Sequence, residues 1–189
     1  MKGRLAFFGR IRRYKNVDGL IAAFLDTQDA EAASGPLTLH VAGRPSSEEL
    51  TATLEDAARQ DPRISVELGF IADEDLVATV TAAELVVLPY REMHNSGSIL
   101  TALSLDRPVL VPNNAANRAL AREVGPEWVL RYSGPLTGEE LLRALATLRA
   151  TPPTGSPDLH RRDWDTAGHA HLAAFREATA AARGHRRIA

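Results

Sequence analysis

Short runs of aliphatic and β-branched residues alternate along this chain with longer segments whose apolar residues recur every three or four positions. The first pair predicts a strand at 4–8 and an amphipathic helix at 17–25. The same alternation predicts further strands at 37–41, 64–68, 85–88, 109–111 and 128–132. It predicts further helices at 47–58, 73–82, 96–104, 117–123 and 138–148.

Six strand–helix units of this kind predict a parallel sheet with helices on both faces. Because crossovers between parallel strands are right-handed, the fold class expected is α/β, with a doubly wound six-stranded sheet that binds ligands at the carboxyl ends of its strands. Residues 1–150 should form this domain. The Pro-, Gly- and Ser-rich run 151–158 should be a linker, and 159–189 a C-terminal helix and tail.

The helical stretch at 160–182 has few apolar residues, so it should need a surface outside itself, either the sheet domain or a partner. Within this stretch, His169 and His171 are two positions apart and do not share a helical face, which argues against a metal pair.

Composition narrows the possible functions. The chain has 189 residues and a net charge of −2, which gives no overall electrostatic case for nucleic acid or an anionic membrane. Cysteine is absent, which removes disulfides, thiolate metal ligands and cysteine nucleophiles. No apolar run approaches the roughly 20 residues that span a bilayer, so the chain is expected to be soluble and to lack a transmembrane segment.

The stretch Leu88 to Pro112 contains the first candidate site. It reads as a strand, a loop of small residues, a helix and a second strand, with Ser96, Gly97 and Ser98 where the helix begins. The first N–H groups of a helix lack internal partners and carry partial positive charge, so this loop favours a phosphate-bearing ligand. The alternative is that Asn95 or Ser96 only caps the helix.

The loop after the first strand is the second candidate. Gly9 allows a tight turn, and Arg10, Arg12, Arg13 and Lys15 supply four cations. An arginine fork together with a mobile ammonium suits a diphosphate. The alternative is a solvated basic loop. In a doubly wound sheet this loop and the Ser96 loop share one edge, which favours a common site.

The run GRIRRYKNVDGLIAAF resembles the GR-xxx-KG-xD-xLI-xAF opening of the donor-binding domain of family 4 (group 1) glycosyltransferases, which are retaining enzymes with the GT-B architecture. The resemblance continues through LHVAGRP, VELGFIADEDLVATVTAAELVVLPY and ALSLDRPVLVP, and so covers nearly all of residues 4 to 150. It implies a Rossmann-like C-terminal half of such an enzyme, with a nucleoside diphosphate sugar as its ligand.

The resemblance also assigns roles to individual residues. It implies that Arg10 and Lys15 hold the diphosphate and that Gly9 belongs to the same loop. It implies further that the phosphates meet the small-residue loop of Ser96, Gly97 and Ser98, and that the nucleobase meets the main chain of Gly69, Phe70 and Ile71.

Two acids typical of the family are missing in register. Counting back from Pro108 places Thr101 where the family has its ribose-binding Glu, and Met93 where it has a Glu near the sugar. Thr101 can still make a neutral hydrogen bond to the ribose. Glu92, one residue from the second position, is a candidate catalytic residue, with an ordinary exposed Glu as the alternative; no catalytic base is assigned. The NSGS sequence resembles an exopolysaccharide-type subgroup.

In the family, the acceptor binds an N-terminal domain that this chain does not contain, so the chain alone is expected to lack hexosyltransferase activity. The C-terminal helix would pack on that missing domain.

The donor is expected to be a UDP-, GDP- or ADP-sugar, used without metal or other cofactor in polysaccharide or glycoconjugate synthesis. The location expected is cytoplasmic, with any membrane contact made by the missing domain. Alternatives are a noncatalytic nucleotide- or phosphate-binding module and half of a sugar-nucleotide epimerase.

Overall fold

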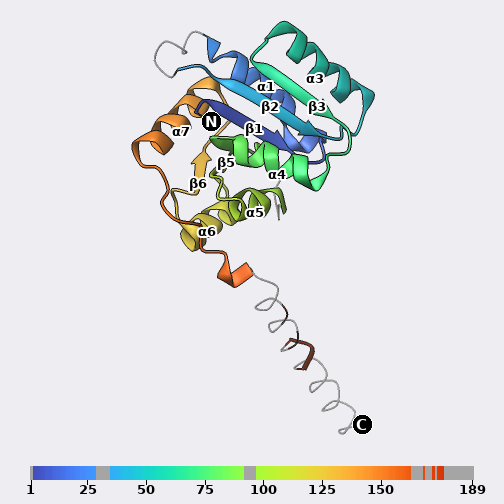
Figure 1. Cartoon of the computed structure of the whole chain (residues 1–189). Helices are drawn as coiled ribbons and strands as arrows, with labels where there is room; N and C mark the ends of the chain where they lie inside the picture. Colours follow the sequence, from blue (N-terminus) through green and yellow to red (C-terminus); the bar gives the residue numbers. More distant parts are fainter. Residues whose placement is uncertain are drawn as a thin grey trace. The chain divides into compact units, whose positions relative to one another are not determined.

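The computed structural model of the chain describes residues 2–28, 35–91 and 97–162, together with residues 168, 172 and 174–176 (Figure 1). The chain divides into two compact units, Met1–Pro157 and Asp158–Ala189. The boundary falls near the end of the run expected to be a linker. Within the described residues, no helix combines the length and hydropathy needed to cross a membrane.

The first unit is built on a six-stranded parallel sheet with the order β3-β2-β1-β4-β5-β6. Its strands are β1 (Arg4–Phe8), β2 (Thr38–Gly43), β3 (Ile64–Leu68), β4 (Leu85–Val87), β5 (Val109–Pro112) and β6 (Val129–Tyr132). The chain adds strands on one side of β1 as far as β3 and then crosses to β4 on the other side. The prediction of a doubly wound, Rossmann-like sheet is confirmed, and its topological switch point lies between β1 and β4.

Helices cover both faces of this sheet (Figure 1). They are α1 (Val17–Leu25), α3 (Glu48–Gln60), α4 (Asp73–Ala82), α5 (Gly97–Ser104), α6 (Ala115–Val124) and α7 (Gly138–Ala150). Helix α1 contacts α3 and α7, whereas α4 packs on β1 and β2. Two 3-10 turns, η1 (Arg13–Lys15) and η3 (His160–Arg162), complete the described elements.

The core lies in the central strands, where every residue from Leu5 to Phe7 and from Leu85 to Leu88 is fully buried. Strands covered on both faces are expected to be continuously apolar, and these are. The candidate site therefore follows strands that are fully buried.

Several element boundaries differ from the sequence predictions for identifiable reasons. Helix α6 begins two residues earlier than predicted because the Asn114 side chain accepts a hydrogen bond from the Asn117 N–H at 2.8 Å and caps the helix. Strand β2 extends to Gly43 because Gly43 pairs in register with Leu68 of β3. In the predicted 160–182 helix, His160–Arg162 is a 3-10 turn, whereas the described residues 168, 172 and 174–176 are helical.

Candidate functional site

Three glycines stand at the carboxyl ends of β1, β2 and β3 and join the loops that follow them. Gly9, Gly43 and Gly69 have φ values of 104°, 146° and 138°, a region that favours glycine. The Gly9 N–H donates to Ala42 O, and the Gly69 N–H donates to Gly43 O, both at 3.0 Å. These bonds connect three separate loops into one continuous surface at the edge of the sheet.

A cavity of about 430 Å³, here called the loop cavity, opens on that surface. This volume is within the usual range of roughly 300–1,000 Å³ for small-molecule sites. Seven residues predicted from the sequence line the loop cavity: Gly9, Arg10, Gly69, Phe70, Ile71, Ser98 and Thr101. Four further lining residues were not predicted: Phe8, Gly43, Arg44 and Leu76. The structure thus brings together residues from the loops after four different strands.

Lys15 and Ser98 converge beside Gly9 at the switch point. A β-carbon built on Gly9 would lie 3.3 Å from Ser98 Oγ and 3.5 Å from Lys15 Nζ. Ser98 belongs to the first turn of α5, where unpaired backbone N–H groups are found. Without a side chain at Gly9, an ammonium, a hydroxyl and a helix N-terminus can approach one anion together.

The four cations of the loop after β1 have different environments. Arg10 is exposed and lines the loop cavity. Arg12 is exposed, and Arg13 pairs with Glu49 of α3, which directs its charge away from the site. Lys15 is only 8% exposed, and burial followed by the positive charge of Arg12 lowers the pKa of its ammonium. Of the four cations in this loop, Arg10 lines the loop cavity and Lys15 lies beside its Gly9, and these are the two that the family resemblance nominated.

The loop cavity also has an apolar wall. Phe70 is 88% exposed although it is a large aromatic residue, and it lines the loop cavity with Ile71 and Leu76. Arg44, which follows Gly43, is exposed on the same cavity. An exposed ring beside a guanidinium offers a stacking surface and hydrogen-bond donors, which together suit a planar heterocycle.

Thr101 lines the loop cavity from the second turn of α5, and its hydroxyl donates to the Gly97 carbonyl at 3.0 Å. The oxygen lone pairs can still accept a hydrogen bond from a ligand. Ser96 and the candidate catalytic residue Glu92 lie outside the described residues, as do Met93 and Asn95. Among the residues that the structure describes, no group of three or more His, Asp or Glu side chains is arranged to hold a metal ion.

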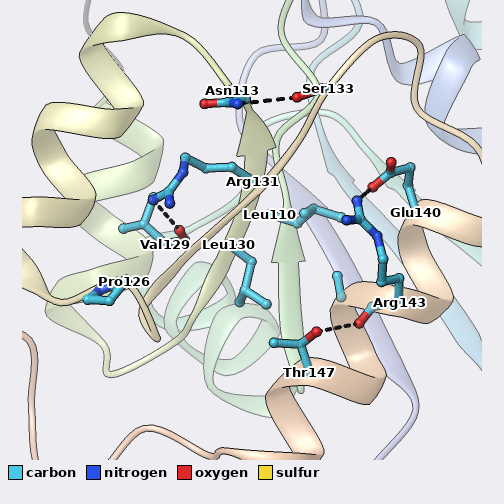
Figure 2. Close-up of a pocket in the computed structure, with 11 residues that line it drawn as sticks. Leu110, Asn113, Pro126, Val129, Leu130, Arg131, Ser133, Glu140, Arg143 and Thr147 are labelled. Atoms are coloured by element: carbon cyan, nitrogen blue, oxygen red, sulfur yellow. Dashed lines mark hydrogen bonds and ion pairs between the residues drawn. The ribbon is translucent and has the colours of Figure 1, made fainter.

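A second cavity, about 440 Å³, lies along the open edge of β6 and is here called the β6 groove (Figure 2). Its two guanidinium groups already have partners: Arg131 donates to the Val129 carbonyl at 3.2 Å, and Arg143 pairs with Glu140. At its rim Asn113 donates to Ser133 at 3.2 Å. The β6 groove is lined from β5, β6 and α7, whereas the loop cavity borders the switch point.

Comparison with known proteins identifies the family of the chain. The model of the family "Glycosyl transferases group 1" matches residues 2–148. The chain belongs to this family. Two curated relatives from Xanthomonas campestris pv. campestris, both named GDP-mannose:glycolipid 4-beta-D-mannosyltransferase, are 44% identical over 176 residues and 43% identical over 178 residues. The matches cover 93% and 94% of this chain but 49% and 50% of the relatives, so the chain spans about half their length.

Solved structures share the fold at lower identity. The C-terminal domain of a group 1 glycosyl transferase from Francisella tularensis superposes with a TM-score of 0.58 and 21% identity, covering 78% of this chain and 75% of that one. An Anabaena protein in complex with UDP-glucose gives a TM-score of 0.60 and 17% identity, covering 78% of this chain and 39% of that one. This chain therefore has the Rossmann-like fold of GT-B glycosyltransferases.

Proposed function

We propose that this chain is the donor-binding half of a glycosyltransferase and that its donor is GDP-mannose. The observation that carries this proposal is that the glycine loops, Arg10 and the start of α5 line one cavity. The ammonium of Lys15 lies beside Gly9 in the same place. The choice of donor is supported by the names of the two relatives, which are 44% and 43% identical to this chain. The product would then belong to polysaccharide or glycoconjugate synthesis.

The diphosphate would lie beside Gly9. There Arg10 offers a planar fork, Lys15 an ammonium and the first turn of α5 its backbone N–H groups. Negative charge grows on the diphosphate as the bond to the sugar breaks, and groups already aimed at that charge lower the barrier. Because two cations supply this stabilisation, we propose transfer without a metal ion.

The nucleoside would occupy the other end of the loop cavity. The ribose would meet the Thr101 hydroxyl, and the base would lie against Phe70, near the main chain of Gly69 and Ile71. Arg44, which lines the same cavity, would donate to a base carbonyl. Guanine presents O6 and N7 as adjacent acceptors, a pattern that arginine binds well, whereas adenine presents a donor in place of O6. Arg44 therefore favours GDP over ADP.

We propose that the parts of the site that bind the sugar and the acceptor need residues from outside this chain. Glu92 stays our candidate for a carboxylate near the sugar. The relatives' name specifies a β-D-mannosyl product, and displacement from an α-linked donor would give it by inversion, whereas the family resemblance of the sequence implied retention. We propose inversion, with the base for the acceptor hydroxyl supplied by the half of the enzyme absent from this chain.

Calorimetric titration of the chain with GDP, UDP and ADP tests the donor assignment. GDP should bind most tightly, and the chain alone should not transfer mannose from GDP-mannose. The variant R10A should weaken GDP binding by about 1.5–3 kcal/mol, the range for hydrogen bonds to charged groups. R12A is the matched control, because Arg12 is an exposed cation of the same loop outside the loop cavity. Equal losses in the two variants, or no binding of any nucleotide, would refute the proposal.

A further inference from the structure

Lys15 is buried, and no carboxylate of the described part of the chain pairs with it. It is 8% exposed, and among the described side chains none of the acids forms an ion pair with it. Moving an ammonium out of water is costly unless something compensates its charge. Another group must therefore stabilise Lys15 before any anion binds.

The ring of Tyr90 is in the position to do so. Lys15 Nζ lies 4.8 Å from the centroid of this ring, within the distance of about 6 Å at which a cation is attracted to an aromatic face. Tyr90 is 3% exposed, and a shielded ring stabilises a cation more strongly than an exposed one.

The Tyr90 ring is itself held by two other rings. Phe7 of β1 and Tyr14 of η1 approach it edge-on, with centroid distances of 6.3 and 6.4 Å and interplanar angles of 73° in both pairs. Edge-to-face contacts of this kind are favourable and directional. The face that Lys15 meets is therefore fixed by neighbours on the β1 side of the switch point.

The backbone locks the same two loops together. Arg91, which follows Tyr90, donates its N–H to the Tyr14 carbonyl at 2.8 Å, and its Nε donates to Asn16 Oδ1 at 2.9 Å. Tyr90 stands in the loop after β4, whereas Lys15 stands in the loop after β1. The ring and the ammonium thus meet across the switch point in a connection that neither loop could make alone.

We propose that Tyr90 is a positioning residue that holds Lys15 Nζ beside Gly9 and Ser98 through its aromatic face. A carboxylate in the same place would neutralise Lys15 and repel a diphosphate. The ring orients the ammonium and leaves its full charge available. The consequence for diphosphate binding rests on the proposed function, whereas the contact between ring and ammonium does not.

The first test measures Lys15 directly. The chain contains two lysines, Lys2 and Lys15, so ¹³C-lysine labelling gives two side-chain signals whose ¹³Cε shifts can be followed with pH. Among the described residues, the groups that face the Lys15 ammonium are the Tyr90 ring from the β4 loop, Ser98 from α5 and Arg12 from its own loop. Y90L should lower the Lys15 pKa further, by about one unit, because the charged form loses its stabilising ring. Y90F should leave it nearly unchanged, and Lys2 should not respond.

The second test measures binding of GDP and of inorganic pyrophosphate by calorimetry. Y90L should weaken both by about 10-fold, since the misplaced group faces the diphosphate, and Y90F should stay within about 2-fold of the wild type. Y132L is the matched control: Tyr132 of β6 is 4% exposed, is also buried, and does not line the loop cavity. Loss of the Tyr132 ring should reduce the free energy of unfolding without changing the affinity for GDP or for pyrophosphate.

If Y90L leaves both the Lys15 pKa and the affinities unchanged, the proposal is overturned. If the wild type binds neither GDP nor pyrophosphate, the proposed function fails, and the titration of Lys15 still decides the role of the ring. Should Y90L not fold, 3,5-difluorophenylalanine at position 90 keeps the ring volume and withdraws electron density from its face. It should lower the Lys15 pKa relative to Y90F, and an unchanged pKa would likewise overturn the proposal.

Discussion

Gly43 lies so near Gly9 that a β-carbon built on Gly43 would be 1.9 Å from the Gly9 carbonyl oxygen. The loops after β1 and β2 are held at this separation by two backbone bonds, from Gly9 to Ala42 O at 3.0 Å and from Ile11 to Arg44 O at 2.9 Å. Neither strand can shift without breaking one of these bonds. This close approach places Arg10 and Arg44 on the same cavity.

The variant G43A should therefore destabilise the chain severely. Both the clash with Gly9 and a φ of 146° oppose a side chain at this position, and we expect a loss of about 3 kcal/mol or more in the free energy of unfolding. Urea denaturation measures it. The control is G134A, since Gly134 has a φ of 78° but no atom within 4 Å of its β-carbon position. The free energy of unfolding of G134A should fall by about 1 kcal/mol. Equal losses in G43A and G134A would show that the contact of Gly43 with Gly9 does not determine stability.

The exposed ring of Phe70 should contribute to binding the base and nothing else. F70A should weaken GDP binding by about 1–3 kcal/mol, the range measured for stacking of a base on an aromatic side chain, and should leave pyrophosphate binding unchanged. Calorimetry with both ligands separates these outcomes. V77A, which removes another exposed apolar side chain from outside the loop cavity, should change neither. A parallel loss for pyrophosphate would mean that Phe70 supports the fold instead.

Thr101 offers a test by gain of affinity. It lines the loop cavity and stands where the family resemblance places a ribose-binding acid. T101E should therefore bind GDP more tightly, whereas pyrophosphate, which has no ribose, should bind no better or slightly worse because of the added negative charge. T101Q supplies a control of similar size without the charge. If T101E loses affinity equally for both ligands, the ribose does not lie at Thr101.

The buried Asp61 predicts how stability depends on pH. Hydrogen bonds from the Arg63 side chain lower the pKa of Asp61 below its ordinary value of 3.8, and Asp61 is 3% exposed. The ionised carboxylate therefore stabilises the fold above that value, and this contribution is lost as the pH falls through the lowered pKa. D61N should be less stable at pH 7 by about 1.5–3 kcal/mol, and the difference from wild type should shrink in acid. A constant difference would contradict the assignment.

The regular elements of the sheet domain could be predicted where their signal was local. Strand β1 at Arg4–Phe8 agrees with its predicted bounds because its apolar run is short and continuous. Helix α4 at Asp73–Ala82 agrees with its predicted bounds because acidic residues mark its first turn. The doubly wound parallel class of the sheet followed from the alternation of strands and helices and from crossover handedness. These features depend on periodicity, which sequence displays directly.

The parts of the site that sequence did not predict depend on contacts between distant loops. Gly43 received no role from the sequence, since its contact with Gly9 forms only when β1 and β2 pair. Tyr90 lies two residues beyond the strand predicted at 85–88, and nothing in the neighbouring sequence indicated that Lys15 would lie over its ring. Arg13 resembled the other cations of its loop until α3 brought Glu49 to it. The chain has 20 arginines and only two lysines, and this composition was the one sequence signal that the lysine at position 15 has a role of its own.

Amide NMR on the ¹⁵N-labelled chain with GDP-mannose tests the central claim most directly, because the loop cavity and the β6 groove have similar volumes of about 430 and 440 Å³. We expect saturating shifts of the amide signals of Gly9, Gly69 and Ser98, which line the loop cavity, and unchanged signals for Arg131 and Ser133 in the β6 groove (Figure 2). Shifts confined to the β6 groove, or no shifts at any GDP-mannose concentration, would contradict that claim.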